Sequence, residues 1–421
     1  MHKFIFLLGI LVKNYRIFIA YRNLLRTEYA DEANLKCIQE KKLRSLIRRA
    51  RVLSPMYEEL LNGIEISNVS LESLDRMNIM SKAKLREINV ELTHNKSHKF
   101  GYIKSETSGT SGEAFLFYRD YWWDAYHRAA IYRGMRQFGV QPWEYNMYLW
   151  GFIFSRKERL KTVFLDWLQN RFRIFHFESI DERLDKKLRK VKYVSGYASV
   201  INSLAEKAIL QNRRYGNVKF IKGTSEKIYP NYKNNTSKVF GVSMISEYGA
   251  AECGIIAFEC TEGNMHVQRE NVILEEIGGR AIVTNLNSHS LPIIRFDLGD
   301  YITLVEKNCT CGRHGQIVSE VLGRVGKDII GKQSIYPSLT LYYVFKDLAL
   351  QNGFELSYCA EQHVVGELKV FIYSSRELEE VTKQIILTKF KRYFTDDVDV
   401  DILLGDISNR KEKLSDFISF L

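Results

Sequence analysis

The sequence predicts an α/β protein with two domains: a large domain over residues 1–330 and a small α+β domain over residues 331–421. The 421 residues exceed the length of one ordinary domain. Between residues 121 and 215, helical patterns alternate with short apolar runs such as "NMYLWGFIF", an order typical of α/β folds. After residue 331 the order becomes helix, strand, strand, helix and strand, which describes a separate compact unit.

The N-terminal leader has an apolar run of nine residues, "FIFLLGILV", between Lys3 and Lys13. Roughly 20 apolar residues are needed to span a bilayer. No small-x-small cleavage site follows, as a signal peptide would require. The pattern favours a helix packed on its own domain, and the alternative is peripheral contact with an anionic membrane through this helix, helped by Arg16, Arg22 and Arg26.

Residues 30–95 have helical spacing. One apolar stripe is expected along "LKCIQEKKLRSLIRRARV", formed by Leu35, Ile38, Leu43, Leu46 and Ile47.

The middle of the chain predicts mixed sheets. "VKFIKGTS" is a strand that runs into a turn, and "KVFGVSMISEYG" is a second buried strand that ends in a loop. "ENVILEEIGGRAIVTNLN" predicts a hairpin across Gly278-Gly279, and "LPIIRFDLGDYITLVEK" adds further strands.

The small domain has a helix in "SLTLYYVFKDLAL", strands in "FELSYC" and "ELKVFIYS", a helix over 378–393 and a strand in "DVDVDILL". The glycines of "GRVGKDIIGK" precede it, and we expect a hinge there.

Composition excludes several classes of protein. With 45% apolar residues the chain buries a large core and is not disordered. The net charge of +11 suits nucleic acid, anionic lipid or a phosphorylated small substrate. No nucleic-acid motif accompanies the basic run "RLDKKLRKVK", so nucleic acid is not an expected partner. Six cysteines are too few for a disulfide scaffold, which favours a cytoplasmic protein.

Four residues that could bind a metal form two pairs in the sequence, Cys260-x₅-His266 and Cys309-x-Cys311. Three sulfurs and one imidazole suit a tetrahedral structural Zn²⁺ that would join two hairpins. The alternative is four reduced residues without a metal. Four protein ligands would leave no open position for catalysis.

Residues 105–115, "SETSGTSGEAF", predict a phosphate-binding loop. Gly109 and Gly112 allow close backbone approach, and Ser108, Thr110 and Ser111 offer hydroxyl donors. The Walker spacing and its lysine are missing, which excludes that class of nucleotide-binding loop.

Four further motifs follow in a fixed order: "GTSE" with Glu226, "SEYGAAE", "IIRFDLGD" and "GRVGKD". Together with "TSGTSG" they resemble the signatures of adenylate-forming enzymes, which activate a carboxylic acid with ATP. The resemblance implies a large adenylate-forming domain and a small, mobile C-terminal domain. It also implies that Ser108, Gly109, Thr110, Ser111 and Gly112 hold phosphates.

The same resemblance assigns the remaining nucleotide contacts. Tyr248 and Gly249 would lie by the adenine and acyl pocket, and Glu252 would help to hold Mg²⁺. Asp300 would bind the ribose hydroxyls with Arg324 beside it. Glu226 would contact adenine or cap a turn.

Details between the motifs look like the phenylacetate-CoA ligase family, and most closely its capsular polysaccharide biosynthesis branch. These are "YVSGYASVINSLAE", "AFECTEGNMHVQRENVILEEI" and "CTCGRHG". By this resemblance Trp150, Gly151 and Tyr197 line the acyl pocket, although such aromatic residues equally suit a core.

The implied chemistry is formation of acyl-AMP from ATP and a small carboxylic acid, then transfer of the acyl group to a thiol such as coenzyme A or to an amine. The tail "NRKEKLSDFIS" places Lys413 at the position of the catalytic lysine, with Lys411 as the alternative. Glu113-Ala114 and Leu298 depart from the family pattern, so the rival hypothesis is a degenerate module that binds nucleotide without reacting. The acid, the acceptor and the oligomeric state are not predicted.

Overall fold

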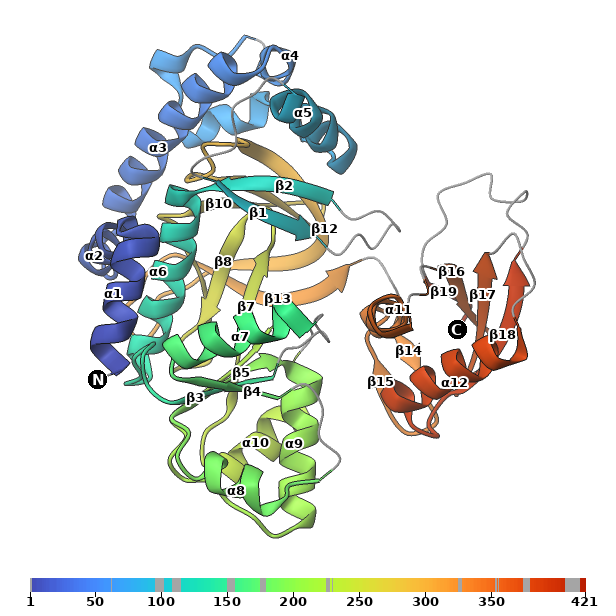
Figure 1. Ribbon diagram of the computed structural model, residues 1–421. Helices are drawn as coiled ribbons and strands as arrows, with labels where there is room; N and C mark the ends of the chain where they lie inside the picture. Colours follow the sequence, from blue (N-terminus) through green and yellow to red (C-terminus); the bar gives the residue numbers. More distant parts are fainter. Residues whose placement is uncertain are drawn as a thin grey trace. The chain divides into compact units, whose positions relative to one another are not determined.

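The computed structural model (Figure 1) describes residues 2–421 except 62, 95–101, 108–114, 150–155, 175–178, 225–227, 229, 325–327, 353, 355, 374–378 and 406–416. The chain forms two compact units: the larger ends at Arg324, and the smaller contains the described residues after it together with Thr107, Phe115 and residues 156–162.

The larger unit is built on an 11-stranded mixed sheet. In sheet order its strands are β10 (Val272–Ile277), β11 (Arg280–Asn285), β12 (Ile293–Glu306), β13 (Gln316–Arg324), β9 (Met265–Val267), β8 (Gly254–Glu259), β7 (Met244–Ala250), β6 (Phe220–Thr224), β5 (Tyr193–Tyr197), β3 (Asn146–Leu149) and β4 (Arg171–Arg173). Strands β4, β3, β5, β6 and β7 are parallel, and every pairing from β7 to β10 is antiparallel. The predicted α/β class with mixed sheets is confirmed.

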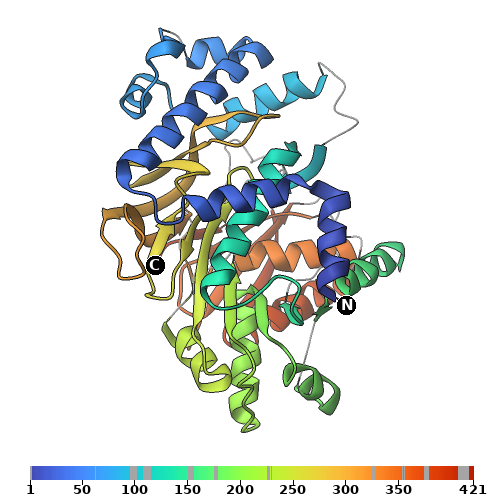
Figure 2. The same cartoon turned by 90° about the vertical axis from the view of Figure 1, so that its left-hand side faces the viewer.

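Helices cover both faces of the parallel strands. Successive side chains of a strand point to opposite faces of the sheet, and here both faces carry apolar side chains that pack against helices. Val194, Ile221 and Met244 pack with α9 (Ala198–Leu210) and α10 (Pro230–Phe240). Their neighbours Tyr193, Phe220 and Ile245 pack with α2 (Arg16–Arg26) and α6 (Tyr121–Gln137). Figure 2 shows α6 and the N-terminal helices, α1 (His2–Asn14) and α2, in front of the strands.

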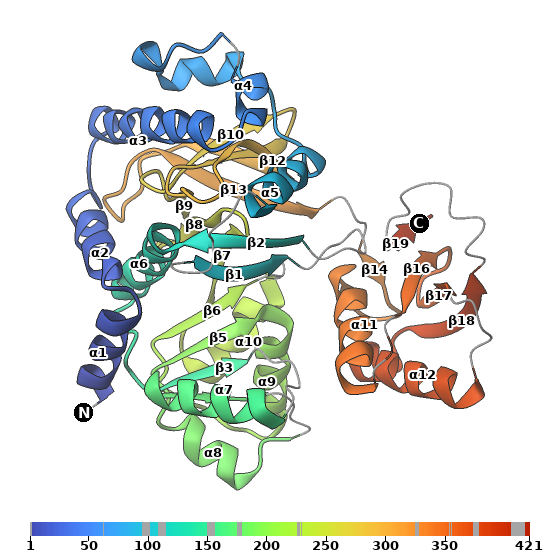
Figure 3. The ribbon, with the colours of Figure 1, turned by 45° about the horizontal axis from the view of Figure 1, so that its top comes forward.

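Helix α3 (Glu32–Leu53) begins at an N-cap, Asp31, whose side chain accepts a hydrogen bond from the Asn34 amide. Its predicted stripe is buried at Leu35, Leu43, Leu46 and Ile47, and half-buried at Ile38. Figure 3 shows α3 beside β10, and the Gln39 amide donates to the Val272 carbonyl at 3.0 Å.

Before residue 324 the described chain also forms the following elements: α4 (Met56–Leu60), the 3₁₀ turns η1 (Ile66–Asn68) and η2 (Leu71–Arg76), α5 (Lys82–His94), α7 (Arg156–Leu168), α8 (Glu182–Leu188), and the two-stranded sheet of β1 (Tyr102–Thr107) and β2 (Phe115–Asp120).

Two sequence predictions differ from the structure and one is confirmed. The residues "KVF" end helix α10, so the strand predicted from Lys238 begins only at Met244. "IIRFDLGDYITLVE" is one long strand, β12, with register shifts, and not several strands. The hairpin at Gly278-Gly279 is confirmed, since Ile277 pairs with Arg280 and both glycines have positive φ, as the tightest hairpin turns require.

The smaller unit is α+β. Its sheet has the order β18 (Asp399–Gly405), β17 (Glu367–Tyr373), β16 (Ser357–Gln362) and β19 (Phe417–Ser419). Helices α11 (Leu339–Asn352) and α12 (Glu380–Phe394) and the strand pair β14 (Ile329–Ile330) and β15 (Ile335–Tyr336) complete it. Val344, Leu348, Val370, Ile386 and Phe390 belong to its core.

No single helix among the described residues is long and apolar enough to cross a membrane. Helices α1 and α2 pass that test only as a pair, and they are bent by 104° at the break between them.

Candidate functional site

The candidate site lies where the parallel strands end. Tyr197 closes β5 in register with Thr224, which closes β6, and β3 ends at Leu149. Strand β7 is both the last parallel strand and the first antiparallel one. In open α/β sheets, ligands bind outside the carboxyl ends of the strands where the topology changes. This edge is therefore the place at which the fold favours a ligand.

Tyr248 and Asp300 meet at this position. The Tyr248 hydroxyl, on β7, donates to Asp300 Oδ2, on β12, at 3.0 Å. Tyr248 is buried, and Asp300 is half-buried and stands opposite Arg324 in the β12–β13 ladder. Two residues 52 positions apart thus form one phenol–carboxylate pair.

Glu252 follows in the turn after β7. Its side chain is buried, with Lys82 Nζ from α5 at 3.9 Å, and its carbonyl accepts a hydrogen bond from Trp123 Nε1 of α6 at 3.1 Å. A Cβ at Gly249 would lie 2.5 Å from the Gly254 carbonyl oxygen, so only glycine fits where this turn closes. The turn thereby holds a carboxylate in a fixed, largely dry position.

The charges of both carboxylates act on the buried Cys253 thiol. Burial raises the pKa of the Cys253 thiol well above its usual value, and the negative charges of Glu252 and Asp300 raise that pKa further. Glu252 and Asp300 therefore act on the same sulfur. Such a neutral thiol is a packing group and not a nucleophile.

A second group of polar side chains, which the sequence analysis did not predict, lies on neighbouring strands. Lys222 Nζ of β6 lies 2.6 Å from Glu247 Oε2 of β7, and the Thr224 hydroxyl donates to Glu247 Oε1 at 3.3 Å. The signal for this pair in the sequence is Lys222, a lysine inside the apolar run "VKFIKG".

A buried histidine, His127 of α6, stacks on Trp123 with ring centroids 5.0 Å apart. Burial lowers the pKa of His127 well below its usual value, and the positive charges of Arg119, Arg128 and Lys222 lower that pKa further. The imidazole is therefore neutral.

Several predicted site residues lie outside the described residues. These are the phosphate-loop residues Ser108, Gly109, Thr110, Ser111 and Gly112, the pocket residues Trp150 and Gly151, Glu226, and the tail lysines Lys411 and Lys413. The backbone of Arg324 is described as the last residue of β13, and its side chain is not.

The four predicted metal ligands come together. The Sγ atoms of Cys260, Cys309 and Cys311 and a ring nitrogen of His266 all lie within 4.8 Å of one another. All are buried except Cys311, which is half-buried.

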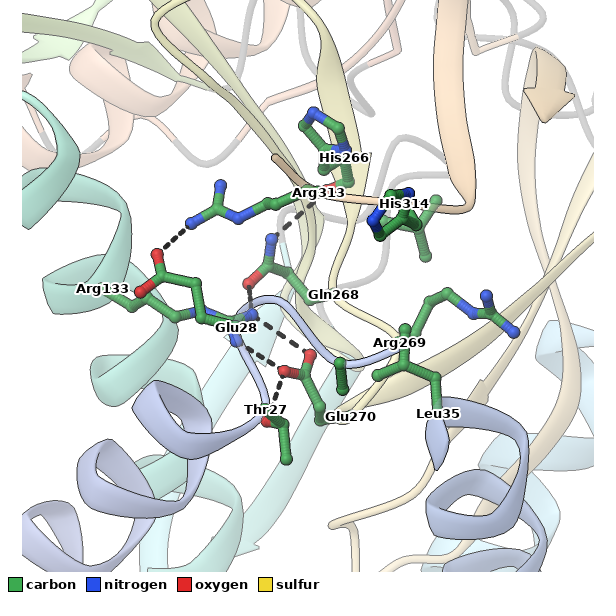
Figure 4. Close-up of a pocket in the computed structure, with 12 residues that line it drawn as sticks. Thr27, Glu28, Leu35, Arg133, His266, Gln268, Arg269, Glu270, Arg313 and His314 are labelled. Carbon is green, nitrogen blue, oxygen red and sulfur yellow. Dashed lines mark hydrogen bonds and ion pairs between the residues drawn. The ribbon is translucent and has the colours of Figure 1, made fainter. Parts of the chain in front are cut away.

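A cavity of about 20 Å³ lies next to this cluster and is lined by charged groups (Figure 4). Arg133 donates to Glu270 at 2.5 Å and to the Gln268 side-chain oxygen at 2.6 Å, and Arg313 pairs with Glu28. The space suffices for about one water molecule. The Arg133 contacts join α6 to the segment after β9, and the Arg313–Glu28 pair joins the segment after α2 to the turn between β12 and β13. The cavity is lined by none of the predicted nucleotide-binding residues.

Comparison with solved structures identifies the fold. The chain is similar to 2-hydroxyisobutyryl-CoA ligase in complex with 2-HIB-AMP and CoA in the thioesterification state, with a TM-score of 0.64 and 16% identity over 93% of this chain and 91% of the ligase. The same ligase in the postadenylation state, in complex with R3-HIB-AMP, gives a TM-score of 0.59 and 17% identity over 93% and 89% of the two chains. The chain thus shares its fold with this CoA ligase. No protein-family model and no curated protein sequence matches it.

Proposed function

We propose that this protein activates a carboxylic acid with ATP and passes the acyl group to a thiol or an amine. The observation that carries the proposal is the convergence of Tyr248, Glu252 and Asp300 at the ligand-binding edge of a ligase-like sheet. Sequence motifs alone predict the same three residues, which lie up to 52 positions apart.

In the proposed reaction, an acid oxygen attacks the α-phosphorus of ATP, the bond to the bridging oxygen breaks, and pyrophosphate leaves. Asp300 would accept hydrogen bonds from the ribose hydroxyls, and its bond from Tyr248 fixes the orientation of the carboxylate. Glu252 fits a Mg²⁺ ligand, because Mg²⁺ in nucleotide sites takes one or two carboxylates together with substrate phosphates. The acceptor thiol or amine would then attack the acyl carbon and release AMP.

The assignments outside the described residues are part of the same proposal. Ser108–Gly112 would hold the departing phosphates, and Lys413 would neutralise charge that develops on them. Arg324 would lie beside the ribose, Glu226 beside adenine, and Trp150, Gly151 and Tyr197 around the acyl group. Tyr197 is buried at the end of β5, which suits a pocket wall.

Pyrophosphate exchange tests the proposal. Labelled pyrophosphate should enter ATP only when a matching carboxylic acid is present, and a panel of acids would identify the substrate. Asp300→Ala should lower the rate of exchange. Nucleotide binding without exchange for any acid would instead favour the degenerate binding module.

The resemblance to the capsular polysaccharide branch supports a role in surface polysaccharide biosynthesis. The acceptor would then be coenzyme A, a carrier thiol or the amine of a sugar. Once the acid is known, AMP release with each acceptor class distinguishes these. Stimulation by an amino sugar alone would support the polysaccharide role, and stimulation by coenzyme A alone would support a general acyl-CoA ligase.

Helix α1 supports peripheral contact with an anionic lipid surface. Phe4, Leu8, Leu11 and Val12 are 77%, 61%, 55% and 81% exposed, and exposed Lys3 and Lys13 flank them. Apolar side chains with flanking cations suit the interface of an anionic bilayer. The protein should float with phosphatidylserine vesicles and not with phosphatidylcholine vesicles. Val12→Ser should weaken flotation, whereas the control Val52→Ser, equally exposed on α3 at 83%, should not. Equal flotation with both lipids would contradict the proposal.

A further inference from the structure

Two hairpin turns carry the four-residue metal-ligating cluster, and they have the same backbone pattern. In the turn after β8, the Cys260 amide donates to the Asn264 carbonyl and the Gly263 amide donates to the Cys260 carbonyl, at 2.9 and 3.0 Å. In the turn between β12 and β13, the Cys309 amide donates to the Arg313 carbonyl and the Gly312 amide to the Cys309 carbonyl, at 3.2 and 3.0 Å.

Each turn therefore begins with a cysteine and has a glycine three residues later. Gly263 and Gly312 have φ values of +75° and +87°, a conformation that favours glycine. The first turn adds His266 from β9, and the second adds Cys311. Two matching turns that each present a cysteine to the other are a specific arrangement, and not a chance grouping of three thiols and one imidazole.

The distances match a tetrahedral metal. Zn–S bonds of about 2.3 Å and Zn–N bonds of about 2.0 Å place tetrahedral ligand atoms roughly 3.5–3.8 Å apart. Cys260 Sγ lies 3.8 Å from Cys309 Sγ, and Cys311 Sγ lies 3.4 Å from His266 Nε2. A disulfide needs two sulfurs at about 2.05 Å, so the Cys260–Cys309 pair is spaced for a shared ion and not for a covalent bond.

We propose that Cys260, Cys309, Cys311 and His266 Nε2 bind one structural Zn²⁺ ion. With four protein ligands the coordination is complete, so the ion takes no part in acyl activation. This site goes beyond the proposed function and stands independently of it.

The environment of His266 supports its role as a ligand. Its Nδ1 is buried without a partner among the described protein groups, while the ring lines the cavity in Figure 4. A histidine that binds metal through one nitrogen usually donates the other N–H to a carbonyl, a carboxylate or water. The cavity, at about 20 Å³, offers Nδ1–H room for one such water.

The position of the cluster gives the ion a structural task. Strand β9 pairs with β13 through only two residue pairs, Ile317 with His266 and Val318 with Met265. In the described sheet this short ladder is the link between β7–β9 and β10–β13. An ion held by Cys260 and His266 on one side and by Cys309 and Cys311 on the other would fasten that link.

Metal analysis of the reduced, full-length protein tests the site. After purification without chelators or a histidine tag, the wild type should retain about one Zn²⁺ per chain through desalting. Cys309→Ala and His266→Ala should retain much less, while Cys37→Ser, which changes an exposed cysteine elsewhere, should retain the ion. In Co²⁺-substituted protein, thiolate-to-cobalt charge-transfer absorption should appear.

Measurements on the wild type alone also decide the matter, so variants that fail to fold do not obscure it. Removal of zinc should lower the melting temperature by at least about 5 °C, and added Zn²⁺ should restore it. A folded wild type that retains no zinc and takes up neither Zn²⁺ nor Co²⁺ would overturn the proposal. So would a count of four free thiols in place of six after denaturation without reductant, because two cysteines would then form a disulfide.

Discussion

The large sheet carries two polar clusters that differ in their chemistry: one presents phenol and carboxylate oxygens, and the other presents three sulfurs and an imidazole. In the oxygen cluster, Tyr248 binds Asp300, and Glu252 is buried with Lys82 at 3.9 Å. In the sulfur cluster, four ligand atoms from two matching turns lie within 4.8 Å. Carboxylate oxygens are hard ligands that suit Mg²⁺ bound together with an exchangeable nucleotide. Thiolates and imidazole suit a Zn²⁺ ion that stays bound. By the two proposals above, the first cluster is a reactive site and the second is a structural site in the same sheet.

The largest effect is expected at the tail lysine. Lys413→Ala should slow adenylation by roughly 10²- to 10³-fold, the usual effect of losing one group that stabilises transition-state charge. Pyrophosphate exchange measures it, and Lys411→Ala is the control, with little change expected. If Lys411→Ala slows adenylation and Lys413→Ala does not, the catalytic lysine is Lys411.

Glu252→Gln should lower the exchange rate by about 10- to 100-fold at fixed Mg²⁺, because a neutral amide is a weaker ligand than a carboxylate. Raising the Mg²⁺ concentration should recover part of the loss. Glu262→Gln, at an exposed position in the turn after β8, is the matched control and should behave as wild type. A loss that does not respond to Mg²⁺ would remove the metal-binding role from Glu252.

Tyr248→Phe removes the hydrogen bond to Asp300 and keeps the ring. Loss of one such bond should raise the KM for ATP by about 5- to 10-fold, with a smaller change in kcat. Steady-state kinetics provide the measurement. An unchanged KM for ATP would mean that the bond does not orient the ribose-binding carboxylate.

The sulfur cluster should show the smallest effect on chemistry. At a temperature where both proteins are folded, Cys309→Ala should exchange pyrophosphate within about twofold of wild type, because a closed structural metal site acts through stability. Thermal unfolding followed beside the kinetics separates the two quantities. A large loss of rate in a fully folded variant would contradict the division between the clusters.

Sequence patterns predicted the residues that lie in short motifs, because such residues are recognised from their immediate neighbours in the chain. Gly278-Gly279 defines its turn by backbone conformation alone, and Tyr248 and Asp300 stand in recognisable segments. Lys82 and Trp123 could not be predicted, because their contacts with residue 252 span 170 and 129 positions and depend on how α5 and α6 pack.

The elements that were misjudged have a similar explanation. A short apolar run such as "KVFGVSMI" suits the end of a helix as well as a strand, and only packing decides that Phe240 ends α10 and Met244 begins β7. The buried Lys222–Glu247 pair was missed because each residue alone is typical of a surface, and only strand register brings them together.

A structure of the protein with ATP and Mg²⁺ tests most directly whether one nucleotide unites these residues. The account predicts ribose hydroxyls within about 3 Å of the Asp300 carboxylate and the metal on Glu252. A nucleotide bound elsewhere, with Asp300 still joined only to protein groups, would contradict it.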